Sequence, residues 1–116
     1  MGNRGKKGLQ EIHEEVITTH INADFDALSS MLAASKLYPD ATLVFPGSQE
    51  KNLRNFFINS VSYLFNFAKV KQVDLDHIKR LILVDTRQRS RIGKFGRLAD
   101  NQDVEIHIYD HHPDST

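Results

Sequence analysis

Short apolar runs alternate with amphipathic stretches along this chain. Residues 16–20 form a β-branched run, VITTH, and residues 27–38 then carry apolar side chains at helical spacing before Pro39. Residues 42–45 form a second apolar run, which ends at a Pro-Gly pair. A longer amphipathic stretch follows, with one face formed by Leu53, Phe57, Val61 and Leu64. We therefore predict two successive strand–helix units.

The second half of the chain continues this alternation. Residues 70–73 are a candidate third strand, and residues 80–84 form a continuous apolar run typical of a strand covered on both faces. Residues 92–99 indicate a short helix, and residues 104–109 form the last strand. The alternation predicts an α/β fold, with a doubly wound, mostly parallel sheet that has helices on both faces.

Composition places the chain among ordinary globular domains. Its 116 residues suffice for one core, and fifteen Lys and Arg balance fifteen Asp and Glu, so no overall basic field points to nonspecific nucleic-acid binding. The chain has no cysteine, and no apolar run approaches the roughly 18 residues that a membrane span needs. We expect a cytoplasmic protein without membrane contact. Residues 1–14 are expected to form a mobile tail and residues 15–116 the domain.

Three of the predicted strands end in residues of the metal-ligand type. The first strand runs into His20, Asp24 and Asp26 within the segment HINADFDA, and the fourth runs into Asp85. The last strand runs into the triplet at residues 110–112, Asp-His-His. The carboxyl ends of parallel strands share one edge of a sheet, so these side chains are predicted to converge there.

Each of these residues also has a structural interpretation. Asp24 or Asp26 is a suitable N-cap for the helix that follows, Asp85 could belong to a turn, and residues 110–113 could form a surface loop. A helix needs only one cap, however, and several carboxylates in one crevice repel one another unless cations compensate their charge. The conjunction therefore favours a metal centre.

The ligand types narrow the choice of metal and reaction. Carboxylates and imidazoles without thiolates suit Mn²⁺, with Mg²⁺ or Co²⁺ as substitutes. Two such ions roughly 3.5–4 Å apart can share a carboxylate and a water molecule, lower the pKa of that water, and stabilise both oxygens of a phosphoryl transfer. The pattern thus indicates phosphoester hydrolysis with two Mn²⁺ ions.

The segments HINADFDA, LVDT and YDHHP, in this order, resemble the first three motifs of the DHH phosphoesterase superfamily. The likeness spans residues 16–113. That superfamily includes RecJ-type exonucleases, oligoribonucleases, cyclic-dinucleotide phosphodiesterases and manganese-dependent pyrophosphatases. The run from Thr19 to Phe56 is most similar to the DHH domain of bacterial multidomain proteins that also carry CBS modules and a tRNA-nucleotidyltransferase-like domain.

The resemblance implies a role for each candidate residue. His20 and Asp24 would bind the first metal ion, and Asp85 would bridge the two ions. Asp110 would support the cluster, in keeping with carboxylates that orient a ligating histidine. The two histidines of the triplet would have different roles. Asp26 and His111 would bind the second ion, and His112 would face the substrate phosphate.

The resemblance also implies parts that we do not find in this sequence. Members of the superfamily use a fourth aspartate well downstream of the triplet and a DHHA1 domain that contacts the substrate. Asp114 follows the triplet too closely to be that aspartate. We therefore expect weak or absent activity from this chain alone. The expected partners are C-terminal domains of a longer protein and nucleotides or short nucleic acids, and the sequence leaves the oligomeric state open, an oligomer included.

Other features leave alternatives open. Arg87 and Arg89 follow Asp85 and could bind a substrate phosphate, although a solvated loop explains them as well. The Asp24-Phe-Asp26 segment also fits a haloacid-dehalogenase-like phosphatase or a receiver domain, but neither explains the triplet. A further alternative is a non-catalytic nucleotide-sensing or assembly module of a tRNA-nucleotidyltransferase-like protein.

Overall fold

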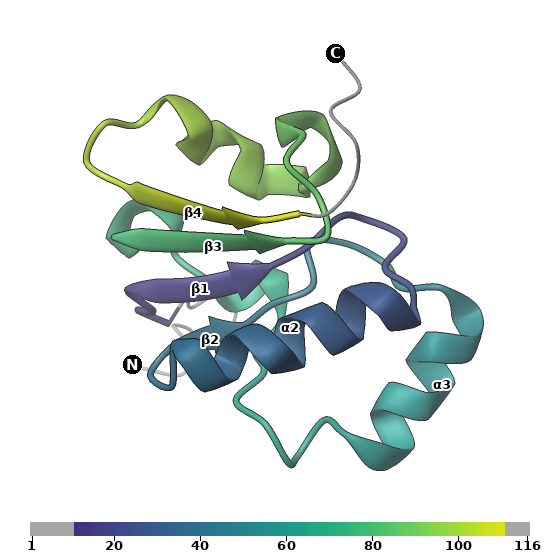
Figure 1. The fold of residues 1–116 in the computed structure, drawn as a ribbon. Helices are drawn as coiled ribbons and strands as arrows, with labels where there is room; N and C mark the ends of the chain where they lie inside the picture. Colours follow the sequence, from purple (N-terminus) through teal and green to yellow (C-terminus); the bar gives the residue numbers. More distant parts are fainter. Residues whose placement is uncertain (1–10, 111–116) are drawn as a thin grey trace, which may run out of the picture.

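The computed structural model describes residues 11–110, with the side chains of residues 57–59 left out of the description. Four strands form one sheet in the order β2-β1-β3-β4, and every neighbouring pair is parallel (Figure 1). The strands are β1 (Glu15–Thr18), β2 (Thr42–Leu43), β3 (Arg80–Val84) and β4 (Glu105–Tyr109). The predicted α/β fold with a parallel sheet is confirmed, and the predicted strand over residues 80–84 is confirmed at both ends.

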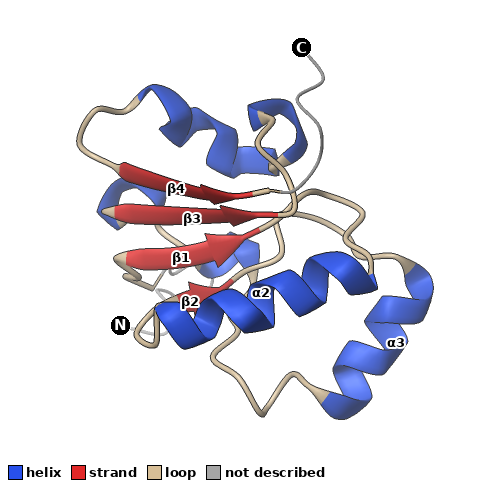
Figure 2. Cartoon of the chain, in the orientation of Figure 1, coloured by secondary structure: helices blue, strands red, loops and turns tan. Residues whose placement is uncertain are grey.

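Two α-helices and four short 3₁₀ segments connect the strands (Figure 2). The α-helices are α2 (Phe25–Leu37) and α3 (Lys51–Ser60). The 3₁₀ segments are η1 (Val70–Gln72), η2 (Leu75–His77), η3 (Arg89–Arg91) and η4 (Gly93–Asp100). None of the helices in the described part of the chain is both long enough and apolar enough to span a membrane.

Two details of the prediction were wrong. The candidate third strand over residues 70–73 is the 3₁₀ turn η1, and only Val73 makes an isolated bridge, to Glu11. The amphipathic helix after β2 ends at Ser60, and Leu64 is 67% exposed. Residues 61–66 form turns instead, which lead the chain back along β2.

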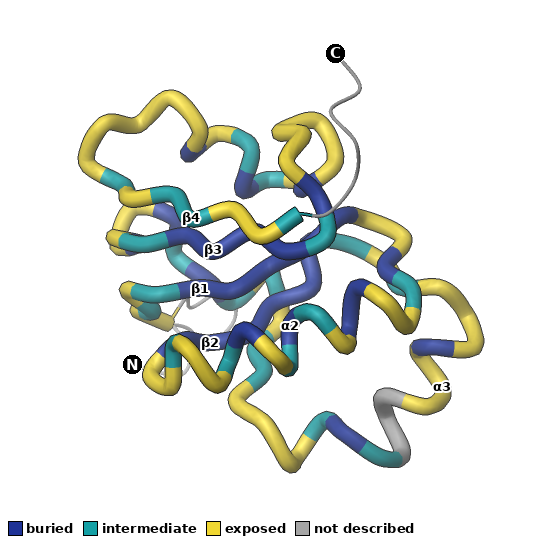
Figure 3. The backbone as a smooth tube through the Cα atoms, in the orientation of Figure 1, coloured by how far each residue is buried: buried dark blue, intermediate teal, exposed yellow. Residues whose placement is uncertain are grey.

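The two central strands, β1 and β3, divide their side chains between two cores, and both strands are buried along most of their length (Figure 3). Ile17 and Ile82 pack on the side of α2, whereas Val16 and Leu81 pack on the side of the 3₁₀ segments. All four are fully buried. This double burial explains why β1 and β3 are continuous apolar runs rather than alternating ones.

The strand order creates a switch point between β1 and β3. The chain leaves β1 through α2 to reach β2 on one side, and it leaves β3 through η3 and η4 to reach β4 on the other. Loops that depart in opposite directions leave a crevice at the carboxyl ends of the two strands, which is where ligands bind in open α/β sheets. His20 follows β1 and Asp85 follows β3, so both lie at this point.

The segment before β1 also contacts the sheet domain. Glu11 donates its backbone N–H to the carbonyl of Gln72 at 2.6 Å, and its own carbonyl accepts from the N–H of Asp74. His13 Nδ1 lies 2.9 Å from the hydroxyl of Thr42. Residues 11–14, which we assigned to the tail, therefore pack against the domain, while residues 1–10 lie outside the described residues.

Candidate metal centre

Three residues from two strand ends form a compact group of ligand atoms. One side-chain atom from each of His20, Asp24 and Asp85 lies within 4.8 Å of the other two. His20 is 7% exposed, and the two aspartates are half-buried. The group joins residues that are 65 positions apart in the sequence, as the parallel arrangement of β1 and β3 requires.

The hydrogen bonds of His20 fix which ring nitrogen faces the group. Its Nδ1 lies 2.9 Å from the carbonyl oxygen of Ile21, and a carbonyl can only accept, so Nδ1 carries the proton. In the neutral ring, Nε2 then presents a lone pair, 3.3 Å from Oδ2 of Asp85. Two acceptors at this distance require a cation between them or a proton on Nε2.

The backbone of Asp85 adopts a conformation that most side chains avoid. Its φ is +61°, in the left-handed region, where Asp and Asn are tolerated better than other residues with a Cβ. Its N–H donates to the carbonyl of Tyr109 at 2.9 Å, so the turn begins where β3 still pairs with β4. Strained conformations of this kind concentrate at functional sites.

Asp24 combines a structural role with membership of the group. Its Oδ1 accepts the N–H of Ala27 at 3.0 Å and so caps the first turn of α2. A carboxylate has two oxygens and several lone pairs, so capping leaves capacity for a metal ion. The capping and metal-ligand interpretations of this residue are therefore compatible.

Backbone hydrogen bonds hold the loop between His20 and Asp24 in place. The N–H of Ile21 donates to the carbonyl of Arg91 at 2.7 Å, and the N–H of Asn22 donates to the carbonyl of Ser48 at 2.9 Å. Asn22 has a φ of +58°, which reverses the chain after His20. Sequence reasoning missed this role, although an Asn between two predicted ligands is the residue type that tolerates the left-handed turn.

The other predicted site residues are placed as follows. Asp26 is exposed in the first turn of α2 and is not part of the three-residue group. Asp110 follows β4, whose last residue, Tyr109, pairs with Val84 just before Asp85, and the Asp110 side chain is 3% exposed and paired with Arg87 at 3.2 Å. Arg89 forms a two-point contact with Asp100, at 2.8 and 3.3 Å. Two residues of the triplet, His111 and His112, lie outside the described residues.

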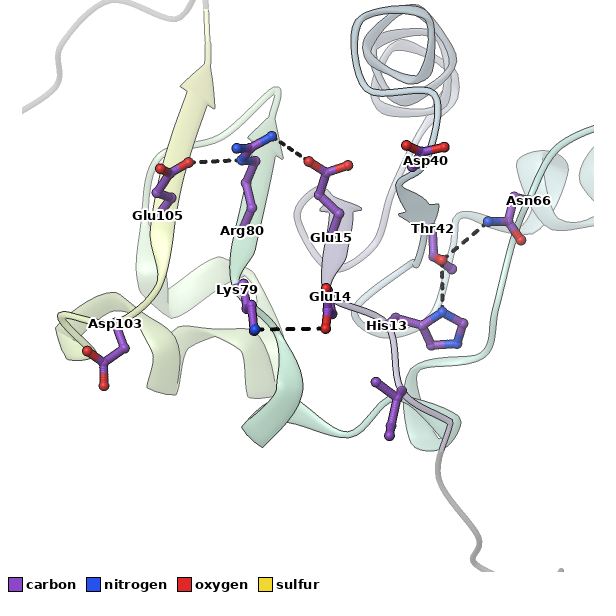
Figure 4. A pocket seen from close by; sticks show the side chains of 11 residues that line it. His13, Glu14, Glu15, Asp40, Thr42, Asn66, Lys79, Arg80, Asp103 and Glu105 are labelled. Atoms are coloured by element: carbon purple, nitrogen blue, oxygen red, sulfur yellow. Dashed lines mark hydrogen bonds and ion pairs between the residues drawn. The ribbon is translucent and has the colours of Figure 1, made fainter.

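A wide polar groove of about 750 Å³ lies at the opposite, amino-terminal edge of the sheet (Figure 4). There Arg80 bridges Glu15 and Glu105 across three strands, and Lys79 pairs with Glu14. The hydrogen bond from the Arg80 guanidinium holds the pKa of Glu105 below its usual range. Both basic residues of the groove are therefore engaged in pairs between strands, and its acidic residues outnumber them.

The donor set fits a divalent cation. Two carboxylates and one imidazole provide oxygen and nitrogen ligands, and the lone pair of His20 Nε2 is directed at the group. The imidazole is oriented through its other nitrogen by a backbone carbonyl, which is the usual support of a metal-ligating histidine. The chemistry of these residues thus fits a divalent cation, as the sequence predicted.

A doubly wound α/β domain with a candidate metal group at its switch point defines the class of this protein, and comparison with known proteins agrees. The model of the DHH family, N-terminal domain, matches residues 15–116, and the chain belongs to this family. It is 55% identical over 102 residues to an A-adding tRNA nucleotidyltransferase of Geobacter sulfurreducens. That alignment covers 88% of this chain and 12% of the relative. No solved structure matches the chain.

Proposed function

We propose that this domain is the metal-binding half of a phosphoesterase that hydrolyses phosphodiester or phosphomonoester bonds with two Mn²⁺ ions. The observation that carries the proposal is the pair of acceptors His20 Nε2 and Asp85 Oδ2, 3.3 Å apart, with Asp24 beside them. This arrangement is favourable with a cation in the group, and carboxylate–imidazole ligands without thiolates suit Mn²⁺. Mg²⁺ and Co²⁺ are the expected substitutes.

Each predicted ligand has a proposed role in the two-ion centre. His20 and Asp24 hold the first ion, and Asp85 is shared between the two ions. Asp26 and His111 complete the second site, and Asp110 orients the triplet while His112 contacts the substrate phosphate. Support for Asp85 as the shared ligand comes from its position, since it stands between the β1 loop and the end of β4.

When bound, the two ions would polarise the phosphoryl group and lower the pKa of an attacking water molecule. The residues of this chain supply the positioning. The carbonyl of Ile21 fixes the proton of His20 on Nδ1, and the cap at Ala27 fixes Asp24. Ligands whose orientation is set before binding lose less entropy when the metal arrives.

The proposed substrates are nucleotides or short nucleic acids. Support comes from the relative, which is called an A-adding tRNA nucleotidyltransferase. The matched segment is only 12% of the length of that relative. The parts that select a substrate would then lie in further domains of a longer protein, and this chain alone should turn over slowly.

A Mn²⁺ titration of the chain, followed by calorimetry and by the Mn²⁺ electron-spin resonance signal, tests the proposal. The parent chain should bind Mn²⁺, and Asp85→Asn should bind none because the shared ligand is lost. Asp103→Asn removes the same charge at the opposite edge of the sheet and should bind like the parent. His112→Ala should also bind like the parent. Undiminished uptake by Asp85→Asn contradicts the assigned centre.

A non-catalytic module is the second candidate, favoured by the fact that the chain spans only 12% of a relative named for another activity. The two candidates differ in one measurement. Mn²⁺-dependent release of nucleotide from a short oligonucleotide, by this chain or by a longer one that includes it, supports the phosphoesterase. Tight Mn²⁺ binding with no hydrolysis in the longer chain supports the module.

A further inference from the structure

The backbone of Arg91 is hydrogen-bonded to the loop that carries His20. Its backbone carbonyl accepts the N–H of Ile21 at 2.7 Å, and Ile21 is the neighbour of His20. The Cα atoms of Ile21 and His20 are about 3.8 Å apart, as in any trans peptide, so the Arg91 carbonyl binds the residue next to a proposed ligand. The side chain of Arg91 is exposed, and it makes no ion pair with the residues that the structure describes.

The neighbouring arginines are engaged elsewhere. Arg87 pairs with Asp110, and Arg89 with Asp100. Both line an apolar groove over one face of β3 and β4, together with Leu83. Of the three arginines after Asp85, Arg91 is the one whose charge is uncompensated within the described residues and whose backbone is tied to the β1 loop.

The turn that carries Arg91 is well anchored on both sides. The next residue, Ile92, is 1% exposed in the core under the 3₁₀ segments. Gly93 has a φ of +60°, and a Cβ there would come within 2.8 Å of the carbonyl oxygen of Pro46. The turn thus packs between the loops that follow β1 and β2, which limits how far Arg91 can move from the centre.

The charge balance of the centre calls for such a residue. Asp24, Asp26 and Asp85 carry three negative charges and the two proposed divalent ions carry four positive charges, so a phosphate dianion would leave the centre with one uncompensated negative charge. In phosphoryl transfer, an Arg commonly stabilises the charge on the phosphoryl oxygens, through hydrogen bonds that are both directional and charge-assisted.

We propose that Arg91 binds the phosphate group of the substrate at this centre, which makes it a substrate-binding residue in place of Arg87 and Arg89. The inference rests on the proposed function, because it assumes a phosphate beside the metal ion. The group that Arg91 contacts is a phosphoryl oxygen of the substrate.

Binding of inorganic phosphate to the Mn²⁺-loaded chain tests the inference. Bound Mn²⁺ broadens the ³¹P resonance of nearby phosphate, so the broadening gives the affinity without turnover. Arg91→Gln should weaken phosphate binding about tenfold, as expected for one charge-assisted hydrogen bond, and Arg91→Lys should weaken it less. Both should keep the Mn²⁺ affinity and the circular dichroism spectrum of the parent.

Two control variants make the result specific. Arg89→Gln removes the same charge from a residue paired with Asp100. Lys51→Gln removes a charge at the start of α3, two residues after Gln49, which forms a bridge with Ala23 in the β1 loop. Both should bind phosphate within twofold of the parent. If Arg91→Gln does so too, or if a control shows the loss instead, Arg91 is not the phosphate contact. If the parent takes up no Mn²⁺, the proposed function fails and the inference with it.

Discussion

The hydroxyl of Thr19 donates to the carbonyl oxygen of Val84 at 2.8 Å. Each of these residues immediately precedes a proposed ligand, since Thr19 is followed by His20 and Val84 by Asp85. Thr19 is fully buried, and the bond joins β1 and β3 at the point where their ladder ends. It therefore sets the separation of the two ligands before any metal binds.

The variant Thr19→Val should weaken Mn²⁺ binding about tenfold, the lower end of what is lost when a residue that orients a metal ligand is removed. It should also lower the free energy of unfolding by about 1–2 kcal/mol, because a buried carbonyl loses its partner. Calorimetric Mn²⁺ titration and urea denaturation measure the two effects.

Thr18→Val is the matched control for this prediction. Thr18 is also fully buried, and its hydroxyl donates to the carbonyl of Val44 at 2.6 Å, between β1 and the end of β2. Neither Thr18 nor Val44 is the sequence neighbour of a proposed metal ligand. A similar stability loss with an unchanged Mn²⁺ affinity is expected, and an equal loss of affinity in both variants would show that Thr19 acts only through general stability.

Asp85 offers a second prediction, because its charge and its backbone conformation can be separated. Asp85→Asn keeps a residue type that tolerates a φ of +61°, whereas Asp85→Ala does not and should be less stable than Asp85→Asn by about 1 kcal/mol. Thermal denaturation of the metal-free variants measures this difference. Equal stabilities would show that the left-handed turn places no demand on this side chain.

Metal linkage provides a third prediction for the same residue. At 100 times its dissociation constant, Mn²⁺ should stabilise the parent chain by about 2.7 kcal/mol, because it binds only the folded state. Asp85→Asn should gain no stability at the same Mn²⁺ concentration. A parallel rise in the melting temperature of both proteins would place the bound ion elsewhere.

The parallel α/β fold and the position of the centre could be predicted from the sequence, because both follow from local patterns. The continuous apolar run at residues 80–84 is typical of a strand buried on both faces, and a ligand-type residue directly after such a strand lies at the carboxyl edge. The same reasoning applied to residues 16–20 brings His20 to that edge, next to Asp85.

What the sequence could not provide depends on contacts between distant segments. Val73 appears in a strand-like pattern, but its pairing with Glu11 is a single bridge, and the preceding residues close a 3₁₀ turn instead. The left-handed turn of Asp85 and the two roles of Asp24 are likewise set by neighbours that local propensity does not include.

Tyr38 yields a prediction about alkaline pH. Its hydroxyl lies 2.7 Å from that of Tyr109 and 2.6 Å from Nδ1 of His107, where it joins the end of α2 to β4. The hydrogen bond with Tyr109, followed by burial, raises the pKa of Tyr38 from 10.0 to about 12. A raised pKa means that the fold favours the protonated phenol. Its contribution to stability is therefore complete below pH 10 and lost as the pH rises toward 12.

Phenolate absorbance at 295 nm measures this titration. The parent chain, which has three tyrosines, should show one late step near pH 12. Tyr38→Phe should abolish the late step, and Tyr63→Phe, at a residue that is 76% exposed, should leave it in place. A late step that survives in Tyr38→Phe would assign the raised pKa to another residue.

Gly93 allows the turn that carries Arg91 to be tested separately from its charge. With a φ of +60° and a virtual Cβ only 2.8 Å from the carbonyl oxygen of Pro46, Gly93→Ala combines a left-handed conformation with a backbone clash. A loss of about 2 kcal/mol or more in the free energy of unfolding is expected. Gly47→Ala, whose Cβ would meet a side-chain methyl of Ile21 at 3.2 Å, should cost less, because that methyl can move.

If Arg91 contacts phosphate as proposed, the two glycine variants should also differ in function. Gly93→Ala displaces the turn and should weaken phosphate binding to the Mn²⁺-loaded chain, even though every charged residue is retained. Gly47→Ala leaves that turn in place and should bind phosphate like the parent at a temperature where both variants are folded. Equal phosphate affinity in the two variants would contradict this prediction. It would show that phosphate binding does not depend on the position of the turn that carries Arg91.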